Sequence, residues 1–316
     1  MLSQKAIHLS LTSLLRQPDV RKRFAEEFPK PRIVLQGKIR ALPANPTHAG
    51  LIGTALDYLL RVHVAVLNTK VRERQWIAES AVDLLRSRIS ARRSIFADGS
   101  RRANRGVIKR AEEIVSDARD EYAKCKRRQC VTAKMSHCAL LLAQLDTFYR
   151  CGILSEEFGR ARESDIGDLR RMLTIARGLL DCPFVASRIC VLNPGFKKAS
   201  FLVNGADADL IVDDTLIEFK ATKHLRFTAE MFHQLVGYYL LYKIGGIAPE
   251  VPPRTRIRHL GVYFARYGVF THLPVDEIVD GARVGAFLRW FKRRAGSALS
   301  LERTTIVTDD GTRVTF

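Results

Sequence analysis

The sequence predicts an α/β fold in which a central mixed β-sheet is flanked by helices and carries a large helical insertion. Apolar residues recur at helical spacing through most of residues 53–181, and this periodicity indicates amphipathic helices. From residue 183 onward, short runs alternate between apolar and polar residues and are separated by turn signals, which is typical of strands. A further helical pattern lies between these runs. Such a succession of helices and strands is characteristic of an α/β core.

The first 182 residues are predicted to be mainly helical. Residues 1–52 form an N-terminal segment that begins as helix and becomes extended where Pro31, Pro43 and Pro46 interrupt the pattern. A first core helix is expected over 53–66. Residues 67–182 are predicted to be a basic helical insertion, with helical patterns over 70–90, 105–150 and 163–181.

The remaining residues are predicted to hold the core and a short tail. The core is expected over 183–295 and the tail over 296–316, where an Asp-Gly turn between two β-like runs (304–316) predicts a terminal hairpin. A helix is expected over 228–243 and another over 275–294. Strands are expected over 185–191, 200–203, 209–212, 215–219, 258–264 and 269–273.

The charge of the chain indicates the class of its partner. It carries 52 Lys and Arg against 33 Asp and Glu, which gives a formal net charge of +19. A folded chain this basic is expected to bind a polyanion, and nucleic acid is the commonest one. Some of the basic residues in the dense stretch 86–110 are explained by a solvated helix face. The others fit a groove that follows a phosphate backbone. Candidate nucleic-acid contacts are Arg92, Arg93, Arg101, Arg102, Arg105 and Lys223.

Several classes of protein are disfavoured by what the sequence lacks. It has no run of 18 apolar residues, so neither a transmembrane helix nor a membrane partner is expected. The N-terminus lacks the apolar segment of a secretory signal and the cysteines number only six, which predicts a reducing, cytoplasmic location. The spacing of those cysteines matches no tight metal-binding pair. Without a glycine-rich loop of the Walker type, ATP hydrolysis is not expected.

The stretch 205–220 carries the chemistry that the sequence predicts. Asp209 opens an apolar run, a turn follows, and a second run ends with Glu218 and Lys220. Because side chains alternate along a strand, Glu218 and Lys220 point to one side, which Asp209 reaches from the neighbouring strand. Two carboxylates and an ammonium at the end of a hairpin suit Mg²⁺ or Mn²⁺ and a phosphoryl transition state.

Other polar residues near this hairpin have competing interpretations. Asp207 lies on the same strand face as Asp209 and competes with it for the metal, although Asp209 directly precedes the apolar run and is favoured. Asp213 and Asp214 are expected in the turn. Arg266 ends a late strand, where a contact to DNA and a place on the surface both fit.

These residues resemble the PD-(D/E)xK nuclease superfamily, in particular its RecB-like exonuclease branch. In that family a glycine and an aspartate precede a turn and a hydrophobic-(Asp/Glu)-x-Lys strand, which matches Gly205, Asp209 and Ile217–Lys220. The helix that follows in this branch carries Gln-x-x-x-Tyr, which matches Gln234 and Tyr238. Residues four apart lie on one face of a helix, so both side chains can face the site.

The resemblance extends to the first core helix. In the family this helix often begins Gly-Thr and bears a His or an acidic metal ligand four positions after the glycine; Gly53, Thr54 and Asp57 match. The resemblance covers residues 50–66 and 183–295 and leaves the helical insertion unexplained. It departs from the branch in three ways: an aspartate replaces the common His, three residues rather than two separate the glycine from the first aspartate, and the cysteines of the iron–sulfur members are absent.

The resemblance implies a restriction-endonuclease-like core and a Mg²⁺- or Mn²⁺-dependent nuclease acting on DNA, either single- or double-stranded. It assigns metal ligation to Asp209, Glu218 and Asp57, assistance of the attacking water to Lys220, and support of the site to Gln234 and Tyr238. Members serve repair, recombination, restriction and anti-phage defence, so further subunits of such complexes are candidate partners. Two other classes stay open: a catalytically silent nucleic-acid-binding module and a structural subunit of a larger nucleoprotein complex.

Overall fold

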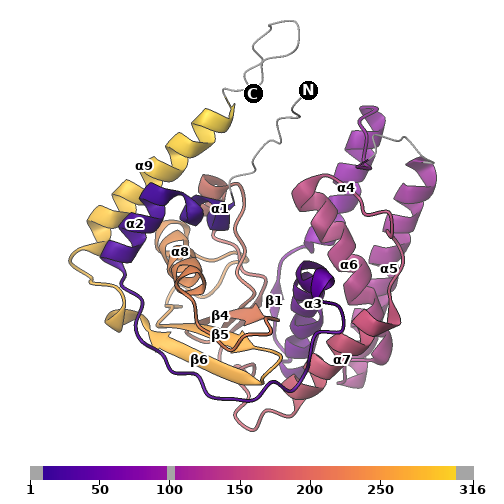
Figure 1. The fold of residues 1–316 in the computed structure, drawn as a ribbon, viewed down its shortest axis with the longest axis horizontal. Coiled ribbons are helices and arrows are strands. Elements are labelled where there is room, and N and C mark those ends of the chain that lie inside the picture. Colours follow the sequence, from indigo (N-terminus) through magenta and orange to yellow (C-terminus); the bar gives the residue numbers. More distant parts are fainter. Residues whose placement is uncertain (1–9, 98–103, 304–316) are drawn as a thin grey trace, which may run out of the picture.

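A mixed β-sheet organises the protein (Figure 1), which is described by a computed structural model over residues 10–97 and 104–303. In this part of the chain the strands lie side by side in sequence order. β1 runs parallel to β2 and β4 parallel to β5, and the other neighbours are antiparallel. The predicted α/β class with a mixed sheet is therefore confirmed. The strands are β1 (Arg72–Glu73), β2 (Cys190–Leu192), β3 (Leu210–Val212), β4 (Thr215–Lys220), β5 (His259–Phe264) and β6 (Val269–Pro274).

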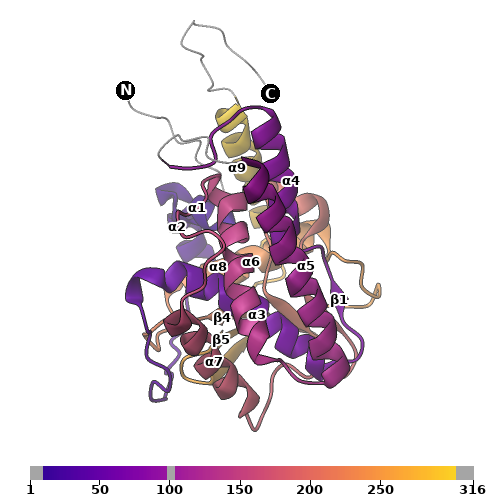
Figure 2. The same cartoon turned by 90° about the vertical axis from the view of Figure 1, so that its right-hand side faces the viewer.

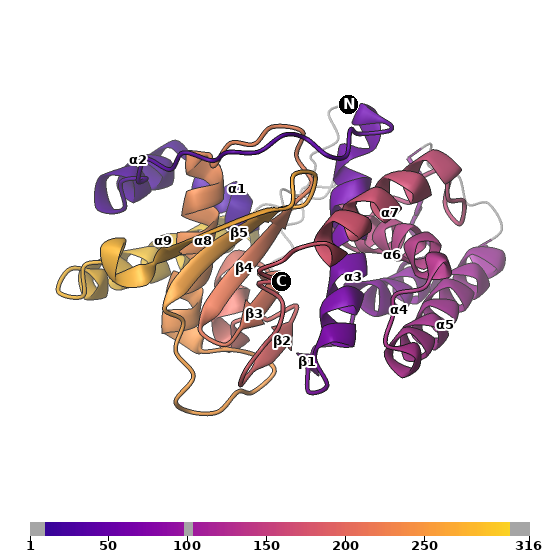
Figure 3. The ribbon, with the colours of Figure 1, turned by 90° about the horizontal axis from the view of Figure 1, so that it is seen from below.

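Helices cover both faces of the sheet, which lies between α3 and α8 in Figure 3. Strand alternation divides the core: Leu210 and Ile217 pack with the helices on the α3 side, whereas Ile211 and Leu216 pack with α8 and with the helices of the two chain ends. The described helices are α1 (Leu11–Arg16), α2 (Pro18–Glu27), α3 (Ala49–Leu67), α4 (Ile77–Ser90), α5 (Asn104–Arg128), α6 (Ala133–Cys151), α7 (Glu163–Arg177), α8 (Ala229–Gly245) and α9 (Val284–Arg303).

The segment predicted as a helical insertion forms a layer of helices, α4 to α7, against α3 (Figure 2). The predicted pattern 105–150 is two helices, because Thr132 caps α6 by accepting a hydrogen bond from the backbone N–H of Met135 at 3.3 Å. The layer is not separate from the core, since β1 lies within the same segment and pairs with β2. The first core helix also begins earlier than predicted, at Ala49 rather than Gly53.

Two predicted strands before the hairpin are wrong or too long. Residues 200–203 belong to a 3-10 helix, Lys197–Val203, in which Ser200 Oγ accepts the N–H of Phe196 and donates to the carbonyl of Ala206. Of the predicted strand 185–191, only Cys190 and Val191 are extended partners of β3. The preceding backbone N–H groups of residues 187–189 instead donate to the carboxylate of Asp213. Side-chain hydrogen bonds thus replaced ladder hydrogen bonds in both places.

The C-terminal elements follow the predictions closely. The β3–β4 hairpin, α8, β5 and β6 are confirmed within one or two residues. The helix predicted over 275–294 is divided into a 3-10 turn, Val275–Glu277, and α9. The predicted hairpin over 304–316 lies outside the described residues. By length and composition, the segment Pro46–Leu67 could cross a membrane, but 67% of its most apolar window is buried in the protein, as in a core helix.

The end of α8 touches the 3-10 helix so closely that it requires a glycine. A Cβ on Gly245 would overlap the carbonyl oxygen of Phe196 and lie 2.8 Å from the Cβ of Ala199. We expect Gly245→Ala to lower the free energy of unfolding by about 1–3 kcal/mol, as overpacking does, in urea denaturation. Gly53→Ala is the control: it meets nothing within 4 Å inside α3, so it should stabilise by up to about 1 kcal/mol. Equal effects of both changes would contradict this account.

Candidate active site

The β3–β4 hairpin brings the predicted acidic residues together. The register pairs Leu210 with Ile217, so Asp209, directly before β3, lies beside the second half of β4. Its Oδ2 accepts a hydrogen bond of 2.6 Å from the backbone N–H of Phe219. This bond places the Asp209 carboxylate between the positions of Glu218 and Lys220 on the neighbouring strand, as the alternation of the sequence predicts.

Four side chains from β4 and α8 form a connected hydrogen-bond network, which we call the β4–α8 cluster: Glu218, Lys220, Gln234 and Tyr238. The Lys220 ammonium donates to Glu218 Oε1 at 2.9 Å and to Gln234 Oε1 at 3.0 Å. The Gln234 amide donates to Glu218 Oε1 and to the Tyr238 hydroxyl, both at 3.0 Å. Gln234 and Tyr238 reach the cluster together because they are four residues apart on α8.

Helix α3 packs on the face of the sheet opposite to α8 and contributes Asp57 to the site. Asp57 Oδ2 forms an ion pair with Arg61, one turn further along the helix, and Arg61 stacks on the ring of Tyr58 at 4.4 Å. Asp57 is close enough to the other carboxylates that the charge of Glu218 acts to raise the pKa of Asp57, and the charge of Asp57 acts to raise the pKa of Asp209. The structure therefore brings all six predicted site residues into one neighbourhood, with Asp57 held by a partner that the sequence interpretation did not include.

Two of the crowded carboxylates, Asp209 and Asp57, have raised pKa values. Burial, followed by the charges of Glu218 and Asp57, raises the pKa of Asp209 well above its usual range. Burial also raises the pKa of Asp57 to about 6, although Arg61 opposes it. Burial acts to lower the pKa of Lys220, but the charges of Glu218 and Asp209 outweigh it and raise that pKa. Lys220 thus stays an ammonium at neutral pH, while the crowding of the carboxylates favours a proton on Asp209 unless a cation replaces it.

The donor set fits a hard divalent cation. Glu218 Oε2 and Asp57 Oδ1 are buried and have no hydrogen-bond partner among the described residues, and such orphaned oxygens are costly unless a cation or donor meets them. Together with Asp209 they supply the carboxylate oxygens that Mg²⁺ and Mn²⁺ prefer. In the described residues, no three acidic, His or Cys side chains are already spaced to surround an ion. Asp57 would bind through the oxygen that Arg61 leaves unpaired.

The raised pKa values predict how a metal ion stabilises the protein at different pH. A carboxyl whose folded pKa is raised contributes stability below its unfolded pKa, near 4, and loses it as pH rises through the folded value, about 6 for Asp57. A bound cation should restore this loss only where the carboxyls are ionised. We therefore expect the Tm difference between Mn²⁺ and chelator to be small at pH 5 and several degrees at pH 7.5. Asp209→Asn should abolish it; a larger shift at pH 5 would contradict the assignment.

The alternative aspartate, Asp207, belongs to a different contact. Its carboxylate forms an ion pair with Arg74, which follows β1, so it ties the loop before β3 to the edge of the sheet. Asp213 has a left-handed backbone (φ 52°) in the β3–β4 turn, where the sequence places it. Neither aspartate is part of the β4–α8 cluster.

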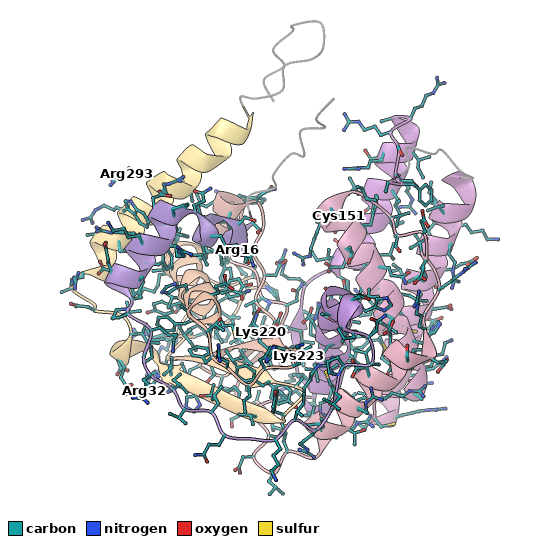
Figure 4. The ribbon with its side chains drawn as sticks, viewed as in Figure 1. Arg16, Arg32, Cys151, Lys220, Lys223 and Arg293 are labelled. Atoms are coloured by element: carbon teal, nitrogen blue, oxygen red, sulfur yellow. The ribbon has the colours of Figure 1, made fainter. Side chains whose placement is uncertain are left out.

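The predicted nucleic-acid contacts are spread over the molecule. Lys223 is exposed and lies near Lys220, three residues after the end of β4 (Figure 4). Arg92 and Arg93 are exposed at the C-terminal end of α4, at the tip of the helical layer and far from β4 (Figure 1). Arg105 is in the first turn of α5, and Arg101 and Arg102 lie outside the described residues. Of the predicted contacts within the described residues, Lys223 is therefore the one that lies close to the cluster.

Arg266 neither lies on the surface nor is available for a contact to DNA, the two placements that fit the sequence. Its side chain is only 2% exposed and forms a two-pronged ion pair with Asp168 of α7, with both N–O distances at 2.8 Å. It also donates to the carbonyl oxygens of Ala221 and Ala41. A buried, fully paired guanidinium cannot contact DNA, so Arg266 is a structural residue that joins the end of β4 to α7.

Three arginines near the site were not predicted from the sequence. Arg61 pairs with Asp57, Arg74 pairs with Asp207, and Arg150 pairs with Asp146 of α6 and feels the charge of Asp207. The spacing of four residues between Asp57 and Arg61 is a helical ion-pair signal and could have identified that partner. Arg74 and Arg150 come from segments more than 50 residues away from the hairpin, and no local signal marks them. Comparison of this chain with protein-family models, curated proteins and solved structures finds no match.

Proposed function

We propose that this protein is a Mg²⁺- or Mn²⁺-dependent nuclease that hydrolyses phosphodiester bonds of DNA, with a restriction-endonuclease-like core of the PD-(D/E)xK type. One observation carries the proposal: the β4–α8 cluster holds a lysine ammonium beside buried carboxylates, two of whose oxygens have no hydrogen-bond partner in the described residues. The mixed sheet with helices on both faces and the helix directly after the Glu-x-Lys strand are compatible with the core that the resemblance implies.

The residues divide the chemistry between them. A cation on Asp209, Glu218 and Asp57 would polarise a phosphoryl oxygen and lower the pKa of water. Lys220 uses two of its three N–H groups on Glu218 and Gln234, and its side chain is 20% exposed. The third N–H is left for the attacking water or a phosphoryl oxygen. Because its pKa is raised, Lys220 orients water and balances charge rather than removing a proton.

Gln234 and Tyr238 hold this arrangement in place. The Gln234 amide links the lysine, the glutamate and the tyrosine hydroxyl, so it fixes the direction in which the ammonium points. Burial and the charges of Glu218 and Asp209 raise the pKa of Tyr238 well above its usual range. Tyr238 is therefore a neutral hydroxyl, and it accepts the amide hydrogen bond. These roles are those of positioning residues.

The test is cleavage of end-labelled and internally labelled nucleic acid by the purified protein. Linear and circular DNA, each single- and double-stranded, and matched RNA are incubated with Mg²⁺, with Mn²⁺ and with chelator. Metal-dependent cleavage of DNA supports the proposal, and cleavage of the circular forms identifies endonuclease action. Cleavage that persists in chelator, or no cleavage of any substrate in either metal, would overturn it.

Two observations favour a second candidate, a catalytically silent nucleic-acid-binding module. Asp57 is paired with Arg61, and no preassembled metal centre exists in the described residues. The net charge of +19 would then serve binding alone, with an affinity that falls steeply with salt concentration. In the same experiment, tight salt-sensitive binding with no cleavage would select this candidate.

A further inference from the structure

A cavity of about 420 Å³ opens between α3 and α6 beside the candidate active site. This volume is within the range of roughly 300–1,000 Å³ that small-molecule sites occupy. Its walls come from the start of α3, the second half of α6 and the segment 155–165. None of the residues assigned above to the metal or to the β4–α8 cluster lines it.

Two observations relate the cavity to the candidate active site. Thr54 lines the cavity from α3, and Asp57 follows three residues later on the same side of the helix. Arg150 lines it from α6, where the carboxylates of Asp146 and Asp207 raise the pKa of its guanidinium although partial burial opposes them.

The walls of the cavity suit a flat, partly apolar ligand with hydrogen-bond donors. Leu51, Leu140 and Ala161 provide apolar surface. Asp165 also lines the cavity; its side chain is 3% exposed, and while Oδ2 contacts His48 Nδ1 at 2.7 Å, Oδ1 has no hydrogen-bond partner among the described residues. A buried carboxylate oxygen without a donor is costly. Asp165 Oδ1 is enclosed, so the ring N–H or exocyclic amino group of a nucleobase would supply a donor once the carboxylate turns toward the cavity.

The rim of the cavity suits a phosphate. Arg160 is exposed at the rim, and its guanidinium makes no ion pair within residues 10–97 and 104–303. Arg150 also lines the cavity, from α6, where its Nε forms an ion pair of 2.5 Å with Asp146 and its terminal N–H groups are left for a phosphate.

We propose that this cavity binds one unpaired nucleotide of the nucleic-acid substrate, with the base against the apolar walls and Asp165 and the phosphate at Arg150 and Arg160. The inference rests on the proposed function in one respect: the bound nucleotide is taken to belong to the strand that the nuclease cuts. A base enters such a cavity only when it is not paired, so the substrate has a single-stranded end or segment beside the scissile phosphate. The nearness of Thr54 to Asp57 places this nucleotide next to the metal ligands.

The test is the affinity for two DNA duplexes, one blunt and one with a short unpaired tail, measured by fluorescence anisotropy in chelator. We expect the wild type to bind the tailed duplex about tenfold more tightly, the size expected for one packed base. Thr147→Trp fills the cavity from an exposed position of α6 and should remove this preference without changing the affinity for the blunt duplex. Arg160→Ala should weaken the preference, and Arg254→Ala, which removes an exposed arginine from a loop outside the cavity, should not.

The outcomes separate this inference from the proposed function. A tail preference that Thr147→Trp removes supports the cavity as a nucleotide site even if no substrate is cleaved, in which case only the nuclease assignment fails. Metal-dependent cleavage together with a tail preference that survives Thr147→Trp would overturn the assignment of the cavity as a nucleotide site and would leave the nuclease assignment intact. A free nucleoside monophosphate that competes as strongly as the tailed duplex would assign the cavity to a free nucleotide and overturn its substrate role.

Discussion

Replacing Lys220 with Met is expected to reduce metal-dependent DNA cleavage by about 10²- to 10³-fold, the loss typical when one charged group that stabilises a transition state is removed. The affinity for uncleaved DNA in chelator should change little, because Lys220 is one cation in a chain of net charge +19. Its ammonium is the group of the β4–α8 cluster that can face water or a phosphoryl oxygen, and Met keeps the length of the stem. The loss should therefore appear in kcat rather than in KM.

Two further variants make this result specific. Lys198→Met removes an exposed lysine with the same change of charge and should cleave like the wild type. Gln234→Leu removes the amide that orients Lys220 and should cause an intermediate loss, since the ammonium keeps its bond to Glu218. A Lys220→Met protein that folds, as judged by circular dichroism, and retains more than a tenth of the wild-type rate would remove Lys220 from the mechanism.

The parts of the site that could be predicted from sequence are those in which short-range periodicity determines direction. Asp209, Glu218 and Lys220 are joined by a short hairpin whose alternation places them on one side, and β3 and β4 formed within one residue of their expected bounds. Gln234 and Tyr238 follow the same logic at helical spacing. In each case a few neighbouring residues contain all the information, because the strand or helix period determines which side chains share a face.

What could not be predicted depends on contacts between distant segments. The strand expected at 200–203 has an acceptable β pattern, yet hydrogen bonds of Ser200 to Phe196 and Ala206 give a 3-10 helix. The short strand β1 is extended only because it pairs with β2, more than 100 residues later. The cavity between α3 and α6 likewise arises from helix packing. Local propensity is a weak guide where tertiary contacts decide the conformation.

The largest stability effect is expected at the ion pair between Arg266 and Asp168. The guanidinium is 2% exposed and satisfies the carboxylate and the carbonyls of Ala41 and Ala221, so it connects α7, the N-terminal loop and the residue that follows Lys220. Removing one partner of a buried pair typically costs about 3–5 kcal/mol, and Asp168 would keep only its longer contact to the half-exposed Arg171, at 3.3 Å. Arg266→Met should lower the free energy of unfolding in urea by that amount.

The double change distinguishes a buried charge from lost packing. Arg266→Met combined with Asp168→Leu removes both charges and keeps most of the volume, and such replacements are often neutral. We therefore expect the double variant to be more stable than Arg266→Met alone, whereas Arg256→Met, at an exposed loop position, should have an effect within about 0.5 kcal/mol of zero. If the double variant loses as much free energy of unfolding as Arg266→Met and Asp168→Leu lose together, the two charges are not coupled. The hydrogen bonds to Ala41 and Ala221 would then account for the stability that Arg266 provides, and the end of β4 would depend on the guanidinium itself rather than on its pairing with α7.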